Sequence, residues 1–431
     1  MRREVGVHER PPIGQSLMLS LQHLFAMFGA TVLVPNLLGV DPAICLLMNG
    51  IGTLLYLWIC KGKIPAYLGS SFAFIAPAGA VIGNYSSTEA GYAAALGGFI
   101  VAGLIFTILA FIIQVAGTGW INTVFPPAAM GAIVAVIGLE LVPVAARMAG
   151  WIAPQDAVDW SPSTDAIILS TVTLLVTMLG SVVFRGFMRI IPILIGIITG
   201  YALAYFMGLV NFGPVAARSW IESPTFTFPV FELAAILTIA PAALVVIAEH
   251  IGHLIVTGNI VKKDLSKDPG LHRSMLGNGL STLLSGFVGS TPNTTYGENI
   301  GVLAITRVYS TFVIGGAAVI AIILSFLGKF SALIANIPVP VMGGVSLLLF
   351  GVIAASGFRM LVESKVDYAK PTNLFLTMIV LVTGLSHAKV TIGSFSLSGM
   401  ALATVVAILF SLLFKLFEVT KLSNDNEASG H

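Results

Sequence analysis

Long runs of apolar residues recur along the whole chain, separated by short polar or charged segments. A helix needs about 20 predominantly apolar residues to cross a bilayer, so each long run predicts one membrane span. Gly, Pro and Asn split or shorten several runs, and twelve or thirteen spans would also fit hydropathy alone. Fourteen runs can be distinguished, at residues 14–38, 43–60, 66–83, 91–114, 125–145, 165–184, 190–210, 232–258, 274–290, 291–306, 308–328, 338–357, 372–388 and 397–417.

The composition agrees with this pattern. Hydrophobic residues make up 57% of the 431 residues and charged residues only 9%, whereas soluble domains carry about 25% charged residues. So few charges cannot cover the surface of a soluble protein, which argues against a soluble enzyme, a nucleic-acid-binding module or a disordered scaffold. We therefore expect an all-α polytopic membrane protein with the lipid bilayer as its surroundings and no nucleic-acid partner.

The positions of the cations favour fourteen spans. With a cytoplasmic N-terminus, seventeen Lys and Arg residues fall in inner segments and four in outer segments. Cytoplasmic loops carry an excess of Lys and Arg, and removing one span would invert everything after it. We therefore expect both termini in the cytoplasm. The inner cations are Arg2, Arg3, Arg10, Lys61, Lys63, Arg185, Arg189, Lys262, Lys263, Lys267, Arg273, Arg307, Arg359, Lys365, Lys370, Lys415 and Lys421, and the outer ones are Arg147, Arg218, Lys329 and Lys389.

Short motifs recur in the same order in the two halves of the chain. Each half holds seven spans, an odd number, so the second copy must enter the membrane from the opposite side. This predicts two inverted seven-span repeats, a plan found in many secondary transporters. The matched motifs are Pro126–Gly131 with Pro338–Gly343, Gln22–His23 with Glu249–His250, and Ser70–Phe74 with Thr294–Glu298.

The third and tenth spans are interrupted at corresponding places. Ser70–Phe74 and Asn293–Tyr296 both read as extended chain. Non-helical backbone at membrane depth is tolerated only inside protein or along a wet cavity, and such breaks mark substrate sites in transporters. We expect the binding site here.

Sixteen of the nineteen acidic residues lie in loops, tails or at span ends, and three lie inside spans: Glu140, Glu249 and Glu298. An ionised carboxylate buried without a partner is costly, so an acid inside the membrane tends to be protonated and is a functional candidate. Glu249 and Glu298 lie in matched parts of the two halves and are our main candidates. Glu140 lies near Pro143 and the outer end of its span, and we interpret it as a packing or interfacial carboxylate.

Histidines lie beside these acids. Glu249 and His253 are four residues apart and share one helical face, so His253 is a candidate for sharing a proton with a carboxylate. His250 must point elsewhere. Gln22 and His23 are candidates for supporting the site. The alternative for all three histidines is a purely structural hydrogen bond, and His23 fits that reading equally well.

Nothing in the chain points to a cofactor or a metal. Glu249, His250 and His253 do not form a compact ligand set, and no Gly-rich phosphate loop ending in Lys-Ser/Thr occurs. Cys45 and Cys60 are interpreted as small packing residues. We expect no cofactor, no metal and no enzymatic activity.

Several of these motifs resemble the nucleobase–ascorbate transporter family, also called nucleobase:cation symporter-2. The segment Glu298–Arg307 fits the family signature, and Ser20–Gly29, Gly62–Phe74, Ala248–His253 and Ser290–Gly297 resemble its proton-coupled, uracil-carrying bacterial members. The likeness covers essentially the whole chain. It implies a secondary transporter of the bacterial cytoplasmic (inner) membrane that imports uracil with protons by alternating access.

The resemblance also implies an architecture. It implies fourteen spans, with short antiparallel strands in spans three and ten, and a homodimer formed through the gate domains. The expected parts are a core domain of residues 1–122 (spans 1–4) and 231–334 (spans 8–11), a gate domain of 123–230 (spans 5–7) and 335–418 (spans 12–14), and a cytoplasmic tail of 419–431.

The site residues follow from the same resemblance. Uracil would contact the side chains of Glu249 and Glu298, lie against Phe72 and Tyr296, and bond backbone at Phe72 and Gly297. Proton coupling is tied to His253 together with both carboxylates. The residues expected to support the site are Gln22, His23, Asn299, Ser346 and Phe350.

One position departs from the family pattern. Phe350 stands where the uracil carriers have tyrosine after Gly343–Leu349, so one hydroxyl is missing; a lost hydrogen bond typically costs about 0.5–1.5 kcal/mol.

Other functions remain open. Xanthine, urate or another pyrimidine are alternative substrates. A membrane-embedded enzyme or a non-transporting nucleobase sensor is a further alternative. Anion exchangers share the fold, but the carboxylates of Glu249 and Glu298 argue against anion exchange.

Overall fold

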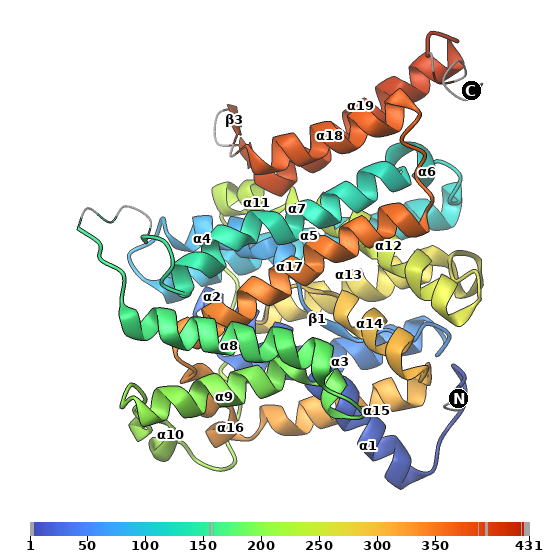
Figure 1. The fold of residues 1–431 in the computed structure, drawn as a ribbon. Coiled ribbons are helices and arrows are strands. Elements are labelled where there is room, and N and C mark those ends of the chain that lie inside the picture. The colour runs from blue at the N-terminus through green and yellow to red at the C-terminus, as the bar shows by residue number, and fades with distance from the viewer. Residues whose placement is uncertain are drawn as a thin grey trace.

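The chain folds into a bundle of helices that is suited to a membrane (Figure 1). The computed structural model describes residues 4–154, 157, 159–386, 388–392, 395–423 and 425. Within these residues seven helices are long and apolar enough to cross a bilayer. The helices α1 (Ile13–Ala26) and α2 (Phe28–Leu38), which meet at an angle of 41°, make an eighth span if they are counted as one.

One group of helices is built from two distant stretches of the chain. Within it α13 packs against α3 and α5, and α15 packs against α1 and α3. Besides α1 and α2, the first stretch contains α3 (Pro42–Ile59), β1 (Leu68–Ser70), the 3₁₀ turn η1 (Phe72–Phe74), α4 (Ile75–Ile82) and α5 (Thr88–Ala116). The second contains α11 (Leu233–Ile239), α12 (Ala242–Val261), the turn η3 (Ser266–Gly270), α13 (Leu271–Val288), β2 (Asn293–Thr295), α14 (Gly297–Thr306) and α15 (Thr311–Ser325).

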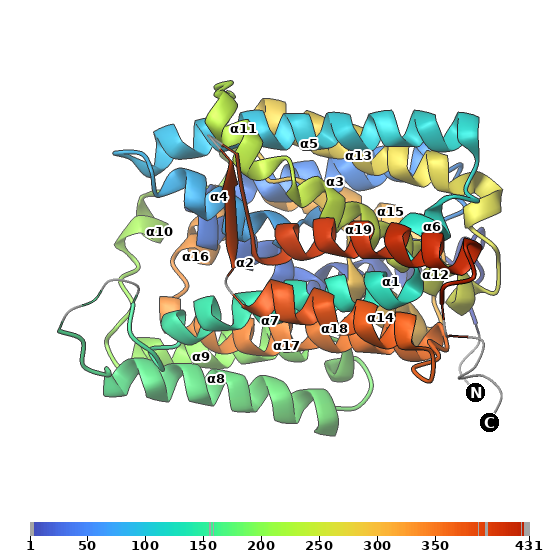
Figure 2. The same ribbon diagram turned by 90° about the horizontal axis from the view of Figure 1, so that it is seen from above.

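A second group is made from the two remaining stretches, and it lies beside the first (Figure 2). Here α17 packs against α7 and α8, and α19 packs against α18 and α7. Its elements are α7 (Pro127–Met148), α8 (Thr164–Val183), the turn η2 (Met188–Ile190), α9 (Pro192–Phe206), α17 (Val339–Glu363), α18 (Pro371–Leu385), β3 (Lys389–Ile392), β4 (Phe395–Ser398) and α19 (Gly399–Val419). The short helices α6 (Ile121–Val124), α10 (Gly213–Ala217) and α16 (Gly328–Ala335) connect longer elements.

The two short strands of the first group pair with each other deep inside the protein. β1 and β2 are antiparallel, and Leu68 lies opposite Thr295. Side chains satisfy further backbone groups there, because the Leu68 N–H donates to Thr53 Oγ1 (2.9 Å) and Thr282 Oγ1 donates to the Asn293 carbonyl (2.9 Å). Backbone that is not helical can lie at membrane depth only when it is satisfied in this way.

The expectation of extended chain throughout Ser70–Phe74 is wrong. The extended backbone ends at Ser71, and Phe72–Phe74 form the 3₁₀ turn η1 that leads into α4. The turn separates the two aromatic rings, so that Phe74 packs against Phe99 of α5 (5.7 Å between ring centroids) while Phe72 faces a cavity. Burial of Phe74 therefore decides the local conformation in place of strand pairing.

The first described residues, before α1, and the end of α19 lie on the same side of the molecule (Figures 1 and 2). On this side Lys63 Nζ pairs with Asp268 (2.6 Å), which keeps the pKa of that exposed carboxyl below its usual range. The Val5 N–H donates to the Arg307 carbonyl (3.0 Å). Of the expected tail 419–431, only residues 419–423 and 425 are described, so most of it lies outside the described residues.

Glu140 serves to join two helices. Its Oε2 accepts a hydrogen bond from the Met400 N–H (2.7 Å), in the first turn of α19. A carboxylate at a helix N-terminus satisfies a free N–H and interacts favourably with the helix dipole. The contact agrees with our interpretation of Glu140 as a packing carboxylate.

The close crossing of α7 and α17 in the second group depends on glycine. A Cβ atom at Gly357 of α17 would lie 2.3 Å from the Ala135 nitrogen of α7, and one at Gly138 of α7 would lie 2.3 Å from the Phe350 carbonyl oxygen. These obstacles are backbone atoms, which cannot rotate away as a side chain can. The absence of a side chain therefore sets the distance between α7 and α17.

We predict that Gly357→Ala destabilises the protein, whereas Gly351→Ala does not. Both glycines are inside α17, but a Cβ at Gly351 would meet no atom within 4 Å. Overpacking typically costs about 1–3 kcal/mol, whereas alanine is favoured over glycine in a helix interior by about 1 kcal/mol. Thermal unfolding in detergent should show a lower Tm for Gly357→Ala and an unchanged or higher Tm for Gly351→Ala; equal shifts would contradict the packing argument.

Candidate functional site

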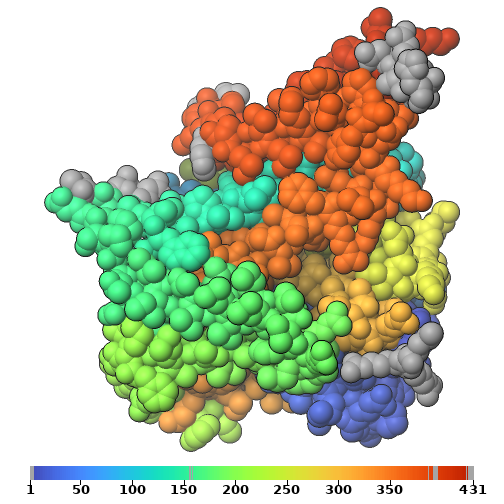
Figure 3. Space-filling model, in the orientation of Figure 1, coloured from blue at the N-terminus to red at the C-terminus, as the bar shows by residue number. Residues whose placement is uncertain are grey.

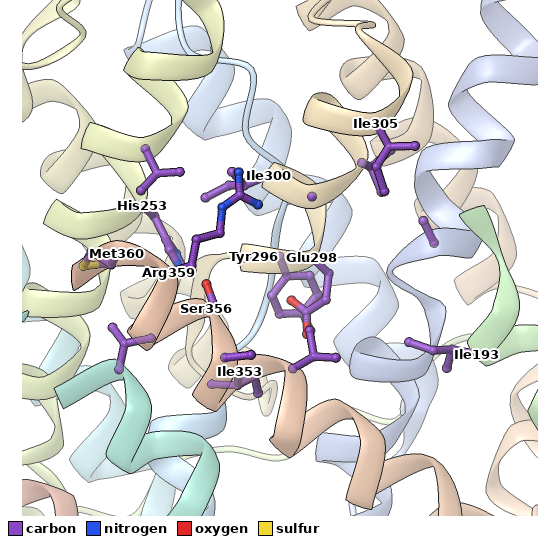
Figure 4. Close-up of a pocket in the computed structure, with 18 of the residues that line it drawn as sticks. Ile193, His253, Tyr296, Glu298, Ile300, Ile305, Ile353, Ser356, Arg359 and Met360 are labelled. Carbon is purple, nitrogen blue, oxygen red and sulfur yellow. The ribbon is translucent and has the colours of Figure 1, made fainter. Parts of the chain in front are cut away.

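A cavity of about 440 Å³ lies where the two helix groups meet. Residues of α12, α14 and α17 line it, together with Phe72 from η1 and Ile193 from α9. Figure 4 shows Tyr296 and Glu298 at the start of α14, facing Ile353 and Ser356 of α17. The wall is mostly apolar, so its few polar groups determine which ligand fits.

Glu249 and Glu298 both line this cavity, one from α12 and one from the first turn of α14. Glu249 is only 8% exposed, and the two carboxyl groups are close enough for their charges to interact. Among the described residues, neither Glu249 Oε2 nor Glu298 Oε1 has a hydrogen-bond partner. An unpartnered buried polar atom is costly, which indicates a site made for a ligand that donates hydrogen bonds or for protons.

Two helices begin at the cavity. The turn η1 starts at Phe72 and leads into α4, and α14 starts at Gly297 directly after β2. The first N–H groups of a helix have no acceptor within the helix, and the helix dipole makes this end favourable for an oxygen acceptor. Gly297 presents no side chain, so its backbone can approach a ligand closely.

The aromatic residues form one side of the site. The rings of Phe72 and Tyr296 lie nearly parallel (28°), with centroids 6.4 Å apart. Tyr296 is fixed by close packing, because a Cβ atom at Gly69 of β1 would lie 2.2 Å from its ring. Flat aromatic surfaces beside unpartnered polar groups suit a planar, polar ligand.

His253 lines the cavity but does not bond to a carboxylate. Its Nδ1 lies 2.9 Å from the Thr295 carbonyl oxygen and 3.3 Å from Thr295 Oγ1. The opposite nitrogen, Nε2, faces Gly297, where a Cβ would lie 3.2 Å away. The structure thus places His253 beside the site without the direct proton sharing with Glu249 that helical spacing alone suggested.

The other expected supporting residues fall into two sets. His23 Nδ1 lies 3.1 Å from Asn299 Oδ1, so these two meet directly behind the start of α14. Gln22 instead borders a separate hollow of about 490 Å³ beside the N-terminal segment. Ser346 donates to the Met342 carbonyl of its own helix (2.6 Å) and does not line the cavity.

Phe350 reaches the cavity only through Phe72. It is fully buried, and its ring meets the Phe72 ring edge-on with centroids 5.9 Å apart. The ring therefore helps to hold Phe72 against the cavity.

Three charged residues that the sequence analysis did not assign to the site also line the cavity. Arg189, Arg359 and Glu363 are exposed at its edge, and Arg359 Nε donates to Glu363 Oε1 (2.6 Å). Figure 4 shows Arg359 extending from α17 toward α14. The sequence could have indicated Arg359 and Glu363 through helical spacing. One face of α17 carries polar residues three and four positions apart, at Ser356, Arg359 and Glu363.

The described residues of the site do not form a metal centre. Within the described part of the chain, no three His, Cys, Asp or Glu side chains gather as metal ligands. The arrangement offers two carboxyl groups as acceptors or donors, helix N–H groups as donors and aromatic surfaces. These groups can bind a flat, polar molecule and exchange protons with it or beside it.

Comparison with known protein families identifies the family of this chain. Residues 14–393 match a family described as the Permease family. The chain belongs to this family. The family membership expected from its motifs is confirmed, and the protein belongs among transporters rather than enzymes.

Several proteins named uracil permease are similar to this chain over nearly their full length. A uracil permease of Paenibacillus larvae is 64% identical over 98% of this chain and 99% of its own length. The uracil permease of Escherichia coli (strain K12) is 64% identical over 97% of this chain and 96% of its own length. Among solved structures, the transmembrane domain of the cyanobacterial bicarbonate transporter BicA is similar in fold, with a TM-score of 0.65 at 15% identity, covering 93% of this chain and 96% of that one.

We predict that the cavity of this permease is open to water in detergent solution. Ser356 and Ser346 both lie on α17, but only Ser356 lines the cavity. A water-soluble maleimide should label Ser356→Cys at least tenfold faster than Ser346→Cys. The natural thiols Cys45 and Cys60 are buried and should stay unlabelled. Equal labelling rates for the two variants would show that the cavity is closed.

Proposed function

We propose that this permease imports uracil together with protons across the bacterial cytoplasmic membrane. The 64% identity to two uracil permeases over nearly the whole chain supports the substrate. The observation that carries the proposal is the pair of carboxyl groups, Glu249 and Glu298, each with an unpartnered oxygen in an apolar cavity where two helices begin.

Uracil complements these groups. Its two ring N–H groups can donate to carboxylate oxygens, and its carbonyls can accept from a protonated carboxyl or from backbone N–H groups at Phe72 and Gly297. Phe72 and Tyr296 provide apolar surface for the faces of the ring. Binding of uracil and of a proton therefore favour each other, because a shared or protonated carboxyl removes the repulsion between the two acids.

We further propose fourteen spans arranged as two inverted repeats. In this assignment each of the segments α1–α2, β1–α4, α11–α12 and β2–α14 counts as one span, as do α3, α5, α7, α8, α9, α13, α15, α17, α18 and α19. The antiparallel pairing of β1 with β2 supports the opposite direction of the two halves. The first helix group then corresponds to the core domain (1–122 and 231–334), and the second to the gate domain (123–230 and 335–418), through which two copies form a dimer.

Transport follows by alternating access. The exposed edge of the cavity carries Arg189 and Arg359, and the positive-inside rule assigns both to the cytoplasmic side. The structure then corresponds to a state open to the cytoplasm, with both termini on that side. Movement of the first helix group against the second would expose the same cavity to the outside, and proton entry down its gradient would drive accumulation.

Uptake into proteoliposomes with an inward proton gradient tests this proposal. Glu298→Gln and Glu249→Ala should each reduce uracil accumulation at least tenfold, because a hydrogen bond to a charged group contributes about 1.5–3 kcal/mol. The control Glu418→Gln changes an exposed acid of α19 that pairs with Lys415 and should leave uptake unchanged. Full, pH-dependent accumulation by Glu298→Gln or Glu249→Ala would refute the assignment.

Competition by other nucleobases identifies the substrate class. Unlabelled uracil should displace radiolabelled uracil far better than xanthine, urate or thymine does. Stronger competition by xanthine or urate would assign a purine carrier, and binding without any accumulation would indicate a sensor.

A further inference from the structure

A continuous chain of polar side chains leads away from the cavity behind His253. His253 Nδ1 lies 3.3 Å from Thr295 Oγ1, which lies 3.4 Å from His250 Nδ1. His250 Nε2 lies 2.8 Å from Ser274 Oγ, and Ser274 Oγ lies 2.6 Å from the Tyr56 hydroxyl. The chain thus joins α12, β2, α13 and α3 inside the first helix group.

All five side chains are shielded from solvent. Tyr56 and Ser274 are 0% exposed, and His253, the most exposed of the five, reaches only 5%. A small cavity of about 10 Å³ borders Tyr56, His250, His253 and Thr295, which is close to the minimum that can hold one water molecule. Only His253 also lines the large cavity, so the route is physically separate from the path of the substrate.

The hydrogen bonds determine which nitrogen of His253 faces the site. A backbone carbonyl can only accept, so Nδ1 must carry the proton that it donates to the Thr295 carbonyl oxygen (2.9 Å). In neutral imidazole the other nitrogen is then an acceptor. This acceptor, Nε2, faces Gly297 beside the two carboxyl groups, where it can take up a proton.

The end of this row of side chains that is farthest from the cavity, at Tyr56, lies near the side of the molecule that carries Lys63 and Arg273. Tyr56 is in the last turn of α3, and Ser274 is in the first turn of α13. Arg273 donates to the Ile59 carbonyl where these two helix ends meet (3.4 Å). This is the side of the Lys63–Asp268 pair, of the residues before α1 and of the end of α19.

Few other titratable groups adjoin this row of five side chains. Glu249 and Glu298 lie at the cavity end, and Cys60, with Arg273 in electrostatic range, lies beside Tyr56 at the far end. Among the described residues, no ion pair involves any of the five members. A proton moving along the chain would therefore not be trapped by a fixed counter-charge.

We propose that His253, Thr295, His250, Ser274 and Tyr56 form a proton route between the substrate cavity and the cytoplasmic face. This inference rests on the proposed proton-coupled function. It assigns Thr295, His250, Ser274 and Tyr56 a role in proton release that is separate from uracil binding.

The transfer balances at every step. In the described part of the protein no hydrogen bond joins His253 to the carboxyl pair, so a proton from that pair reaches His253 Nε2 through a water molecule in the shared cavity. The Nδ1 proton then passes to Thr295 Oγ1. The hydroxyl proton of Thr295 moves to His250 Nδ1, the Nε2 proton of His250 moves to Ser274 Oγ, and the Ser274 hydroxyl proton moves to Tyr56. The Tyr56 hydroxyl is buried, so it passes its own proton to a water molecule that enters from the inner face between the ends of α3 and α13. Hydroxyl rotation and return of the two imidazoles to their first tautomers complete the cycle without net charge.

Variants at Ser274 separate this role from simple packing. Ser274→Ala removes the relaying hydroxyl, whereas Ser274→Thr keeps it. Two measurements in proteoliposomes are compared: uracil counterflow at equal pH, which needs no net proton release, and uracil-coupled proton flux reported by a pH dye in the lumen. Ser274→Ala should lower coupled proton flux and gradient-driven accumulation at least fivefold while counterflow stays within twofold of wild type. Ser274→Thr should retain both activities.

Tyr56→Phe provides an independent variant, because it removes only the terminal hydroxyl and keeps the ring that packs edge-on against His250 (6.3 Å). It should show the same selective loss of proton flux. Wild-type proton flux in both Ser274→Ala and Tyr56→Phe would overturn the route, as would a parallel loss of counterflow and flux in both. Absence of uracil counterflow in the wild type would instead overturn the proposed function and the route with it.

Discussion

The need to satisfy every backbone polar group at membrane depth constrains this protein more than any other requirement. Two segments interrupt their helices inside the bundle, and they meet this requirement by pairing with each other as β1 and β2 and by bonding to Thr53 and Thr282. Each strand leads into a helical segment, so the starts of η1 and α14, whose first N–H groups have no acceptor within the helix, are brought to one place. Both starts border the cavity.

Two kinds of polar group therefore coexist in the interior. Some of the polar groups behind the site are hydrogen-bonded within the protein, as in the contact of His23 Nδ1 with Asn299 Oδ1. The carboxyl oxygens Glu249 Oε2 and Glu298 Oε1 have no partner within the described residues. A stable framework with a few unsatisfied groups at its centre is what a transporter needs, since it must bind its substrate and release it again.

The second helix group is held together by close backbone packing, whereas the site consists of a few polar groups in a cavity. Contact between α7 and α17 depends on glycines whose missing Cβ atoms allow backbone to touch backbone. One face of α17, in the second group, completes the cavity with Ser356, Arg359 and Glu363. The cavity thus lies between the two helix groups, and its lining combines residues from both.

The sequence by itself determined the membrane class, the two carboxylates, the interrupted segments and the family, because these depend on composition, on charges that lipid does not tolerate and on local motifs. Only the tertiary structure decided three further points. Phe72–Phe74 form a turn because Phe74 is buried against Phe99. His253 bonds Thr295 and not Glu249, because β2 passes beside α12. His250, Ser274 and Tyr56 form one hydrogen-bonded chain because α3 packs against α13, which puts Tyr56 beside Ser274, 218 residues further along the sequence. Helical periodicity gives the face on which a residue lies but not the partner across from it.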